Sequence, residues 1–151
     1  TPAPTYVTAA PSASCPDDYV KSTVSDVCYS ALVDESGPWT DCNDACVARG
    51  DTMLCVRNAE ENAFVFETLA VDPKVHLWIG YTDSVTEGAF EWVDGCDSTY
   101  VNWSPGEPNN ANDEDYGCIF APNRNKDGAW NDFPNSGKGQ RVNCYCERPL
   151  F

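Results

Sequence analysis

The feature that most constrains this chain is its content of nine cysteines in 151 residues. The sequence has a single histidine and no two cysteines separated by two residues, so the zinc-binding and thioredoxin-like patterns are absent. Several disulfide bonds formed in an oxidising compartment fit better. Because the count is odd, at least one thiol is free or pairs with another chain. The cysteines therefore indicate a disulfide-stapled protein that is secreted, extracellular or on a cell surface.

The charge of the chain argues against several classes of partner. The sequence has 24 acidic against 9 basic residues, a formal net charge of −15. Nucleic acids and anionic membranes bind patches of Lys and Arg, so neither is expected as a partner. No apolar run reaches the roughly 20 residues that span a bilayer, so membrane insertion is not expected. The balance suits hard cations or basic partners, although acids outside a site also keep a protein soluble.

The chain divides into an N-terminal extension and one domain. Residues 1–14 (TPAPTYVTAAPSAS) are mostly Pro, Thr, Ala and Ser without charge, which is typical of a stalk or linker and of O-glycosylated segments. Residues 15–151 have the length of a single domain that can build a substantial core.

Two helices are expected early in this domain. The first has an apolar face at helical spacing made up of Trp39, Cys42 and Cys46. Gly50 can end it. The second begins after the N-cap Asn58, has Glu61 as capping-box partner, and ends before Pro73. Its apolar set is expected to be Ala59, Ala63, Phe66 and Ala70.

Short strands and long polar loops are predicted for the rest of the chain. The strand candidates are residues 75–80, 89–95, 118–121, 128–130 and 140–147. Alternation in the last candidate places Val142, Cys144 and Cys146 on one face. Helices followed by strands predict an α+β domain.

One loop concentrates acids and amides. The stretch WSPGEPNNANDEDYGC, residues 103–118, holds four acids and three asparagines without any Lys, Arg or His. Calcium binds about six to eight oxygens from carboxylates, amide carbonyls and water. Such oxygens are offered by Glu107, Asn109 and Glu114 in this loop and by Asn131 and Asp132 in a WND stretch. The spacing is not that of an EF-hand, and a merely solvated acidic loop is the alternative on composition alone.

Several motifs follow one another in the order of a known family. They are CPDDYVKSTVSDVCY (15–29), WTDCNDACVARGDTMLCV (39–56), LWIGYTDSVTEGAFEWVDG (77–95), EPN (107–109), WND (130–132) and CYCE (144–147). From residue 15 to residue 147 the chain resembles the C-type lectins. The resemblance implies the long-form C-type lectin-like fold: two helices, small antiparallel sheets and a long calcium-binding loop, with no enzymatic activity.

The resemblance also implies a set of calcium ligands. The principal ligands would be Glu107, Asn109, Glu114, Asn131 and Asp132, with a cis peptide bond before Pro108. Asp113 or Asp115 could replace Glu114, depending on the loop length. An auxiliary site would use Asp83 and Glu87, be completed by Asp115 and Glu114, and include Asn110. Asn110 stands where the family usually has Asp, so this second site lacks one charge.

The expected ligand is a glycan of the mannose type. The implied sugar-binding residues are Glu107, Asn109, Glu114 and Asn131. Each sugar hydroxyl can accept from an Asn amide and donate to a Glu carboxylate while it contacts calcium. In the family the EPN order goes with mannose, fucose, glucose and GlcNAc. Single sites of this kind are weak, so an oligomer or a larger multidomain assembly is expected.

Two disulfides are implied by the resemblance, namely Cys15–Cys28 and Cys46–Cys146. The second common disulfide of the family is missing, because Tyr116 and Asn135 stand in its place. Cys42 lies one helical turn before Cys46, and Cys144 lies two strand residues before Cys146. The remaining pairings are then Cys42–Cys144 and Cys96–Cys118, with Cys55 free.

Four further features of the sequence need an interpretation. Asn102 begins a glycosylation sequon, although an unmodified Asn in a turn is equally consistent with the sequence. The connection 119–129 is longer than is usual in the family and either adds a sugar contact or only surface. His76 lies in an apolar run and is interpreted as structural. The tryptophans are interpreted as core residues: Trp39, Trp78, Trp92, Trp103 and Trp130.

Two functions outside sugar binding remain. The fold could serve as an ice-binding, mineral-binding or protein-binding adhesive module, for which the acid-rich surface is suitable. A glycosidase pair of carboxylates is conceivable among so many acids, but acids flanked by Asn do not suggest a raised-pKa catalytic group.

Overall fold

The computed structural model describes residues 14–150, so the predicted stalk over residues 1–14 lies outside the described residues except for Ser14. The helices are α1 (Trp39–Ala48), α2 (Ala59–Leu69) and the 3-10 turn η1 (Gly137–Gly139). The strands are β1 (Val20–Lys21), β2 (Val27–Tyr29), β3 (Asp34–Glu35), β4 (Thr52–Met53), β5 (His76–Thr82), β6 (Glu91–Trp92), β7 (Tyr116–Ile119), β8 (Trp130–Phe133), β9 (Val142–Cys144) and β10 (Cys146–Pro149).

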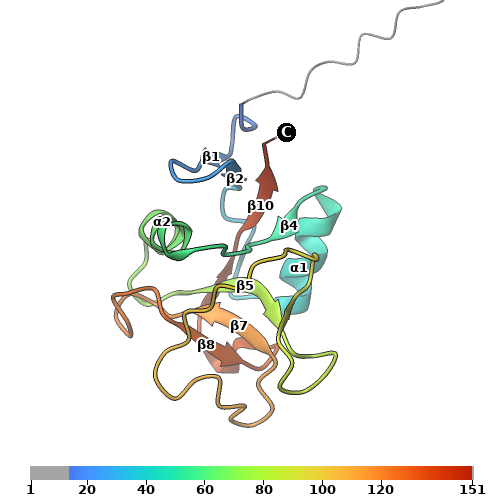
Figure 1. Ribbon diagram of the computed structural model, residues 1–151, viewed down its shortest axis with the longest axis vertical. Coiled ribbons are helices and arrows are strands. Elements are labelled where there is room, and N and C mark those ends of the chain that lie inside the picture. The colour runs from blue at the N-terminus through green and yellow to red at the C-terminus, as the bar shows by residue number, and fades with distance from the viewer. Residues whose placement is uncertain (1–13, 151) are drawn as a thin grey trace, which may run out of the picture.

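The strands form two small sheets, as the α+β prediction requires. One sheet has the order β1-β2-β10-β4, and the other has the order β3-β9-β5-β7-β8 with β6 beside β5. Pairing is antiparallel except between β5 and β9. The predicted strand over 140–147 is divided at Tyr145, because β9 and β10 belong to different sheets. Figure 1 shows α1 and α2 on opposite sides of β5, with the long loops gathered at the lower end.

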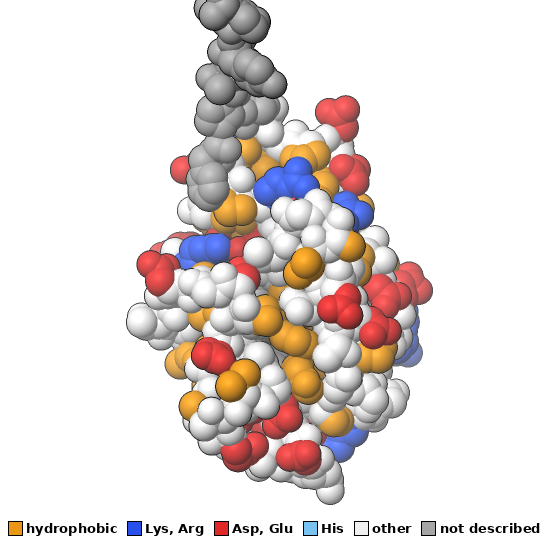
Figure 2. All heavy atoms as spheres, turned by 90° about the vertical axis from the view of Figure 1, so that its right-hand side faces the viewer, with side chains coloured by type: hydrophobic (Ala, Val, Ile, Leu, Met, Phe, Trp, Pro, Cys, Tyr) orange, Lys and Arg blue, Asp and Glu red, His pale blue; other side chains and the backbone are white. Residues whose placement is uncertain are grey.

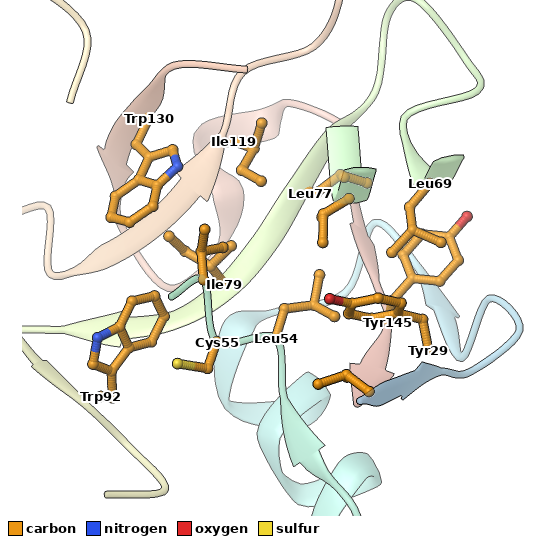
Figure 3. Packing of buried hydrophobic residues seen from close by; sticks show 13 residues of the cluster. Tyr29, Leu54, Cys55, Leu69, Leu77, Ile79, Trp92, Ile119, Trp130 and Tyr145 are labelled. Carbon is orange, nitrogen blue, oxygen red and sulfur yellow. The ribbon is translucent and has the colours of Figure 1, made fainter. Parts of the chain in front are cut away.

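Alternation along β5 divides the core into two clusters. Leu77 and Ile79 face a cluster that includes Trp130 (Figure 3), and Trp78 faces a second cluster that includes Trp39. The tryptophan prediction is confirmed for Trp39, Trp78, Trp92 and Trp130, which are buried. Trp103 is half-buried and packs edge-on against Trp130.

Helix α1 has the predicted face. Trp39 and Cys42 are buried, and the Trp39 indole donates to the carbonyl of Ile79 at 2.8 Å. The first amides of the helix are satisfied by Asn135: its carbonyl accepts from Trp39 N, and its side chain accepts from Thr40 N. Asn135, which stands at one of the two positions of the missing family disulfide, thus contacts the start of α1.

Helix α2 begins where predicted but buries a different face. The Asn58 side chain accepts from Glu61 N at 2.8 Å, which confirms the N-cap. The predicted apolar set is wrong for Ala59 and Ala63, which are exposed, whereas Phe66 and Ala70 are half-buried and pack against the core. The buried residues are Glu61, Asn62, Val65 and Leu69. Half of this face is polar and hydrogen-bonded to the rest of the fold, so a search for apolar periodicity cannot find it.

Three of the predicted disulfides are confirmed. They are Cys15–Cys28, Cys42–Cys144 and Cys46–Cys146. The last two lie side by side and join α1 to β9 and β10.

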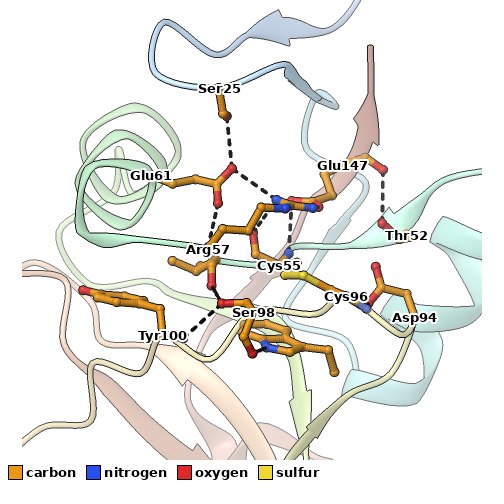
Figure 4. Close-up of a disulfide and its surroundings, with 12 residues drawn as sticks. Ser25, Thr52, Cys55, Arg57, Glu61, Asp94, Cys96, Ser98, Tyr100 and Glu147 are labelled. Carbon is orange, nitrogen blue, oxygen red and sulfur yellow. Dashed lines mark hydrogen bonds and ion pairs between the residues drawn. A yellow bond between two sulfur atoms is a disulfide. The ribbon is translucent and has the colours of Figure 1, made fainter. Parts of the chain in front are cut away.

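The Cys96–Cys118 prediction is wrong, because Cys96 pairs with Cys55 (Figure 4). Cys118 is free and buried in the middle of β7, where its side chain packs in the Trp39 cluster. Cys55 and Cys96 pack in the other cluster, so the sheet separates Cys118 from Cys96.

Candidate metal centre in the acidic loop

The loop before β7 has an ordered backbone. The peptide bond between Glu107 and Pro108 is cis, as the resemblance implies. Asn110, Asn112 and Asp113 have positive φ, a region that Asn and Asp tolerate better than most residues. Figure 2 shows acidic side chains at the lower end of the molecule, where Figure 1 places the loops after β5 and before β7.

Asp132 from β8 holds the Glu-Pro-Asn turn against the sheet. Its two carboxylate oxygens accept from the backbone amides of Asn109 at 3.2 Å and Asn110 at 2.8 Å. The Asn109 side-chain amide donates to Glu107 Oε1 at 2.9 Å. Glu107, Asn109 and Asp132 are therefore brought together.

Glu114 and Asn131 lie at the same place and are buried. Glu114 N donates to the side-chain oxygen of Asn110 at 2.8 Å. Asn131 precedes Asp132 on β8, and its amide nitrogen donates to the Asp132 carbonyl at 2.8 Å. Of the three consecutive acids, Glu114 is the buried one, whereas Asp113 is exposed.

Sequence reasoning missed Lys138. Its ammonium, carried on η1, lies 2.8 Å from Glu114 Oε1. No sequence signal points to this contact, because the two residues are 24 positions apart and no periodic pattern connects them.

The charges in this cluster are poorly balanced. Burial first, and then the neighbouring Asp132 and Glu114, raise the pKa of Glu107 to about 7. Glu107 Oε2 is buried and has no hydrogen-bond partner among the described residues. Three carboxylates therefore face a single half-exposed ammonium. Carboxylate and amide oxygens around an unpartnered buried oxygen fit a hard cation such as calcium.

A second acidic group lies beside the first. Ligand atoms of Asp83, Glu87 and Asp115 lie within 4.8 Å of one another. Asp83 Oδ1 is buried and unpartnered among the described residues, while Oδ2 accepts from Gly88 N. Burial first, and then the Asp83 charge, raises the pKa of Asp115. The side-chain oxygen of Asn110, the fourth expected auxiliary residue, instead accepts from Glu114 N.

The other singled-out residues lie farther along the fold. His76 is buried, and its Nδ1 accepts from Ala121 N at 3.0 Å. The Asn102 side chain donates to the Gly128 carbonyl at 3.0 Å. Within the connection 119–129, Asn123 N donates to the Pro73 carbonyl beyond α2.

The chain belongs to the C-type lectin family: residues 35–148 match the family model of the lectin C-type domain. Domains of this family and fold bind carbohydrate rather than catalyse reactions, and the family generally uses calcium. None of the helices in residues 14–150 is long and apolar enough to cross a membrane.

Named relatives agree with this assignment. The chain is 35% identical over 99 residues to a mannose-binding protein of Gallus gallus, a match that covers 66% of this chain and 36% of that protein. The C-type lectin CEL-I of Cucumaria echinata superposes with a TM-score of 0.78 at 29% identity, over 91% of this chain and 99% of CEL-I. A calcium-independent type II antifreeze protein shares the fold, with a TM-score of 0.76 at 21% identity, over 91% of this chain and 96% of that protein.

Proposed function

We propose that this protein binds glycans bearing mannose, fucose or GlcNAc in a calcium-dependent manner, outside the cell. The observation that carries the proposal is the convergence of the EPN turn, Glu114 and β8 around an unpartnered buried carboxylate oxygen. A ligand set of Glu107, Asn109, Glu114, Asn131 and Asp132 would hold the ion. When bound, calcium would neutralise these acids and offer coordination positions to hydroxyl oxygens.

The chain's own side chains would orient the sugar. Asn109 Nδ2 and Glu107 Oε1 lie 2.9 Å apart, so a donor and an acceptor are already adjacent. A sugar hydroxyl that contacts both side chains would accept from the amide and donate to the carboxylate. Glu114 and Asn131 would serve the neighbouring hydroxyl. In the family this order of Glu and Asn goes with equatorial 3- and 4-hydroxyls, which supports mannose-type sugars over galactose.

The test is binding to immobilised mannose with competing sugars. Wild type should bind in calcium, elute with chelator, and be displaced by mannose or fucose more readily than by galactose. The double variant Glu107→Gln, Asn109→Asp keeps two oxygen ligands and the net charge but exchanges acceptor and donor, so its preference should change about ten- to a hundred-fold. Asp113→Asn is the matched control, because Asp113 is exposed in the same loop.

A surface-binding function is the second candidate, favoured by the fold shared with the antifreeze protein. Calcium binding without displacement by any monosaccharide would support this candidate and overturn the lectin proposal. Clustering of several copies is proposed as well, because single sites of this kind bind weakly.

A further inference from the structure

A small notch lies beside the candidate metal centre. It has a volume of about 130 Å³ and is lined by His76, Phe120, Arg124, Phe133, Lys138 and Gln140. His76 and Phe133 are buried and form its floor, whereas Arg124, Lys138 and Gln140 are exposed and form its rim. The volume corresponds to about four water molecules, which admits a sulfate or carboxylate group but no sugar ring.

The notch is positively charged in an acidic protein. Two of the chain's 9 bases line it, and no acid is among its described lining residues. Arg124 forms no ion pair within residues 14–150. The Arg124 charge acts on His76 in the floor of the notch. Burial first, and then this charge, lower the pKa of His76 to about 4. His76 is therefore neutral at physiological pH, and the positive charge comes from Arg124 and Lys138.

Lys138 connects the notch to the candidate metal centre. Its side chain lines the notch, while its ammonium lies 2.8 Å from Glu114 Oε1. The side chain is 46% exposed, and an ammonium has three donors, so donors remain for a ligand. When Glu114 serves as a metal ligand, Lys138 is left with positive charge at the edge of the notch.

We propose that this notch binds the anionic substituent, a sulfate or carboxylate, of a glycan whose hydroxyls occupy the neighbouring EPN site. The inference rests on the proposed sugar-binding function and makes acidic glycans the preferred ligands. Arg124 supplies a planar fork suited to two oxygens of either anion, and Lys138 supplies a point charge. Part of the long 119–129 connection thereby gains a role in ligand choice.

The experiment compares neutral and acidic sugars of the same configuration. The affinities of GlcNAc, GlcNAc-6-sulfate, glucose and glucuronic acid are measured by calorimetry in saturating calcium. One or both anionic sugars should bind about ten-fold more tightly than their neutral counterparts, GlcNAc and glucose. The preference should weaken as salt is raised, because the rim charges are exposed to solvent. A gain for one anion alone identifies the group that the notch accepts.

Matched variants assign the effect to the notch. Arg124→Gln should remove most of the anionic preference without changing the affinity for GlcNAc, and Arg124→Lys should keep part of it. Lys138→Gln should also reduce the preference. Lys126→Gln is the control, because Lys126 is an exposed base of the same connection that does not line the notch. Melting curves establish that each variant is folded.

The outcomes separate the two proposals. Equal, calcium-dependent binding of neutral and anionic sugars overturns the notch and leaves the lectin function in place. An anionic preference that survives Arg124→Gln also overturns it. Failure of every sugar to bind while calcium is bound overturns the lectin function itself.

Discussion

Two clusters of carboxylates in this domain differ in how much of their negative charge is compensated by a base of the protein. In the first, Arg57 lies between Glu61 and Glu147 and pairs with both (Figure 4). Glu61 also accepts from Ser25 and from Arg57 N, and Glu147 accepts from Cys55 N. Burial still raises the pKa of Glu147 to about 7, so its charge depends on Arg57.

The acidic loop has no such residue at its centre. Within residues 14–150 the one base that pairs with any of Glu107, Glu114 and Asp132 is Lys138, which contacts Glu114 from the edge. Glu107 keeps an oxygen without a partner among the described residues. In the first cluster the half-buried Arg57 compensates the carboxylates on folding alone, whereas we propose that the loop cluster receives its compensating cation from solution.

The largest expected effect comes from removing the internal cation. Arg57→Gln leaves Glu61 and Glu147 buried without their base, so the free energy of unfolding should fall by about 3–5 kcal/mol. Calcium should not restore it, because the cluster lies apart from the loop. Urea denaturation measures the change. Arg141→Gln is the control, since its pair with Asp72 is exposed and should change stability by less than about 1 kcal/mol. Equal losses of stability in Arg57→Gln and Arg141→Gln would show that the Arg57 pairs contribute no more than an exposed ion pair.

The same substitution should have opposite consequences in the two clusters. In calcium-free buffer, Glu61→Gln places an amide against the donors of Arg57 and Ser25 and should lower stability by about 1–3 kcal/mol. Glu107→Gln removes a repelling charge and adds a donor beside Asp132, so stability should be unchanged or rise by up to about 1 kcal/mol. Denaturation of both variants in calcium-free buffer measures the two changes in the free energy of unfolding. A large loss for Glu107→Gln would mean that the loop carboxylate is already satisfied.

Without calcium, the stability of the protein should fall as pH rises, because of Glu107. The folded pKa of Glu107 is about 7, above its ordinary value of 4.5, so the folded state takes up a proton more readily. Its contribution to stability is present below pH 4.5 and is lost as pH rises through about 7. Without calcium, wild type should therefore lose stability relative to Glu107→Gln as pH rises across this window. The difference is small, because Glu107 is partly exposed. Parallel pH profiles of the two proteins would contradict the assignment.

Calcium affinity should fall over the same range as pH is lowered, because protons compete for the ligand carboxylates. Calcium titrations at several pH values measure this competition. An affinity that is constant down to strongly acidic pH would exclude these carboxylates as the ligands.

The smallest effect concerns Lys138. Its ammonium competes with a metal ion for Glu114, so Lys138→Gln should raise calcium affinity about two- to five-fold, the range of an exposed ion pair. Calcium titration by calorimetry measures the change, with Lys126→Gln as control. A lower affinity in Lys138→Gln would show that Lys138 supports the site instead of competing for it.

Local patterns explain which parts of the structure could be predicted. The α1 face, the Asn58 cap, β5 and the crowded acids of the loop are short-range signals. The family resemblance implies Cys46–Cys146, and helix and strand spacing then places Cys42–Cys144 beside it. The structure confirms the helix face, the cap, the strand and the disulfides, and for the loop the sequence identifies the segment in which the acids gather.

The errors arise where a residue depends on a distant partner. Glu61 is buried where Ser25 and Tyr29 donate to it, and Asn62 is buried where the Trp130 indole donates to it. Apolar periodicity cannot reveal either of these distant contacts. Cys96 pairs with Cys55 because both lie on one side of the sheet. Lys138 reaches Glu114 from a turn whose position depends on the whole second sheet. Long-range packing fixes all three.

The most direct test of the central claim is thermal melting of the same protein in calcium and in chelator. Calcium binds the native state selectively, so a concentration about 100 times its Kd should add about 2.7 kcal/mol of stability. That corresponds to a rise in Tm of about 5–10 °C for a domain of this size. Asp132→Asn should lose most of the rise, and Asp97→Asn, an exposed acid outside the loop, should keep it. Identical melting of wild type in calcium and in chelator would contradict the account, because the loop cluster would then need no external cation.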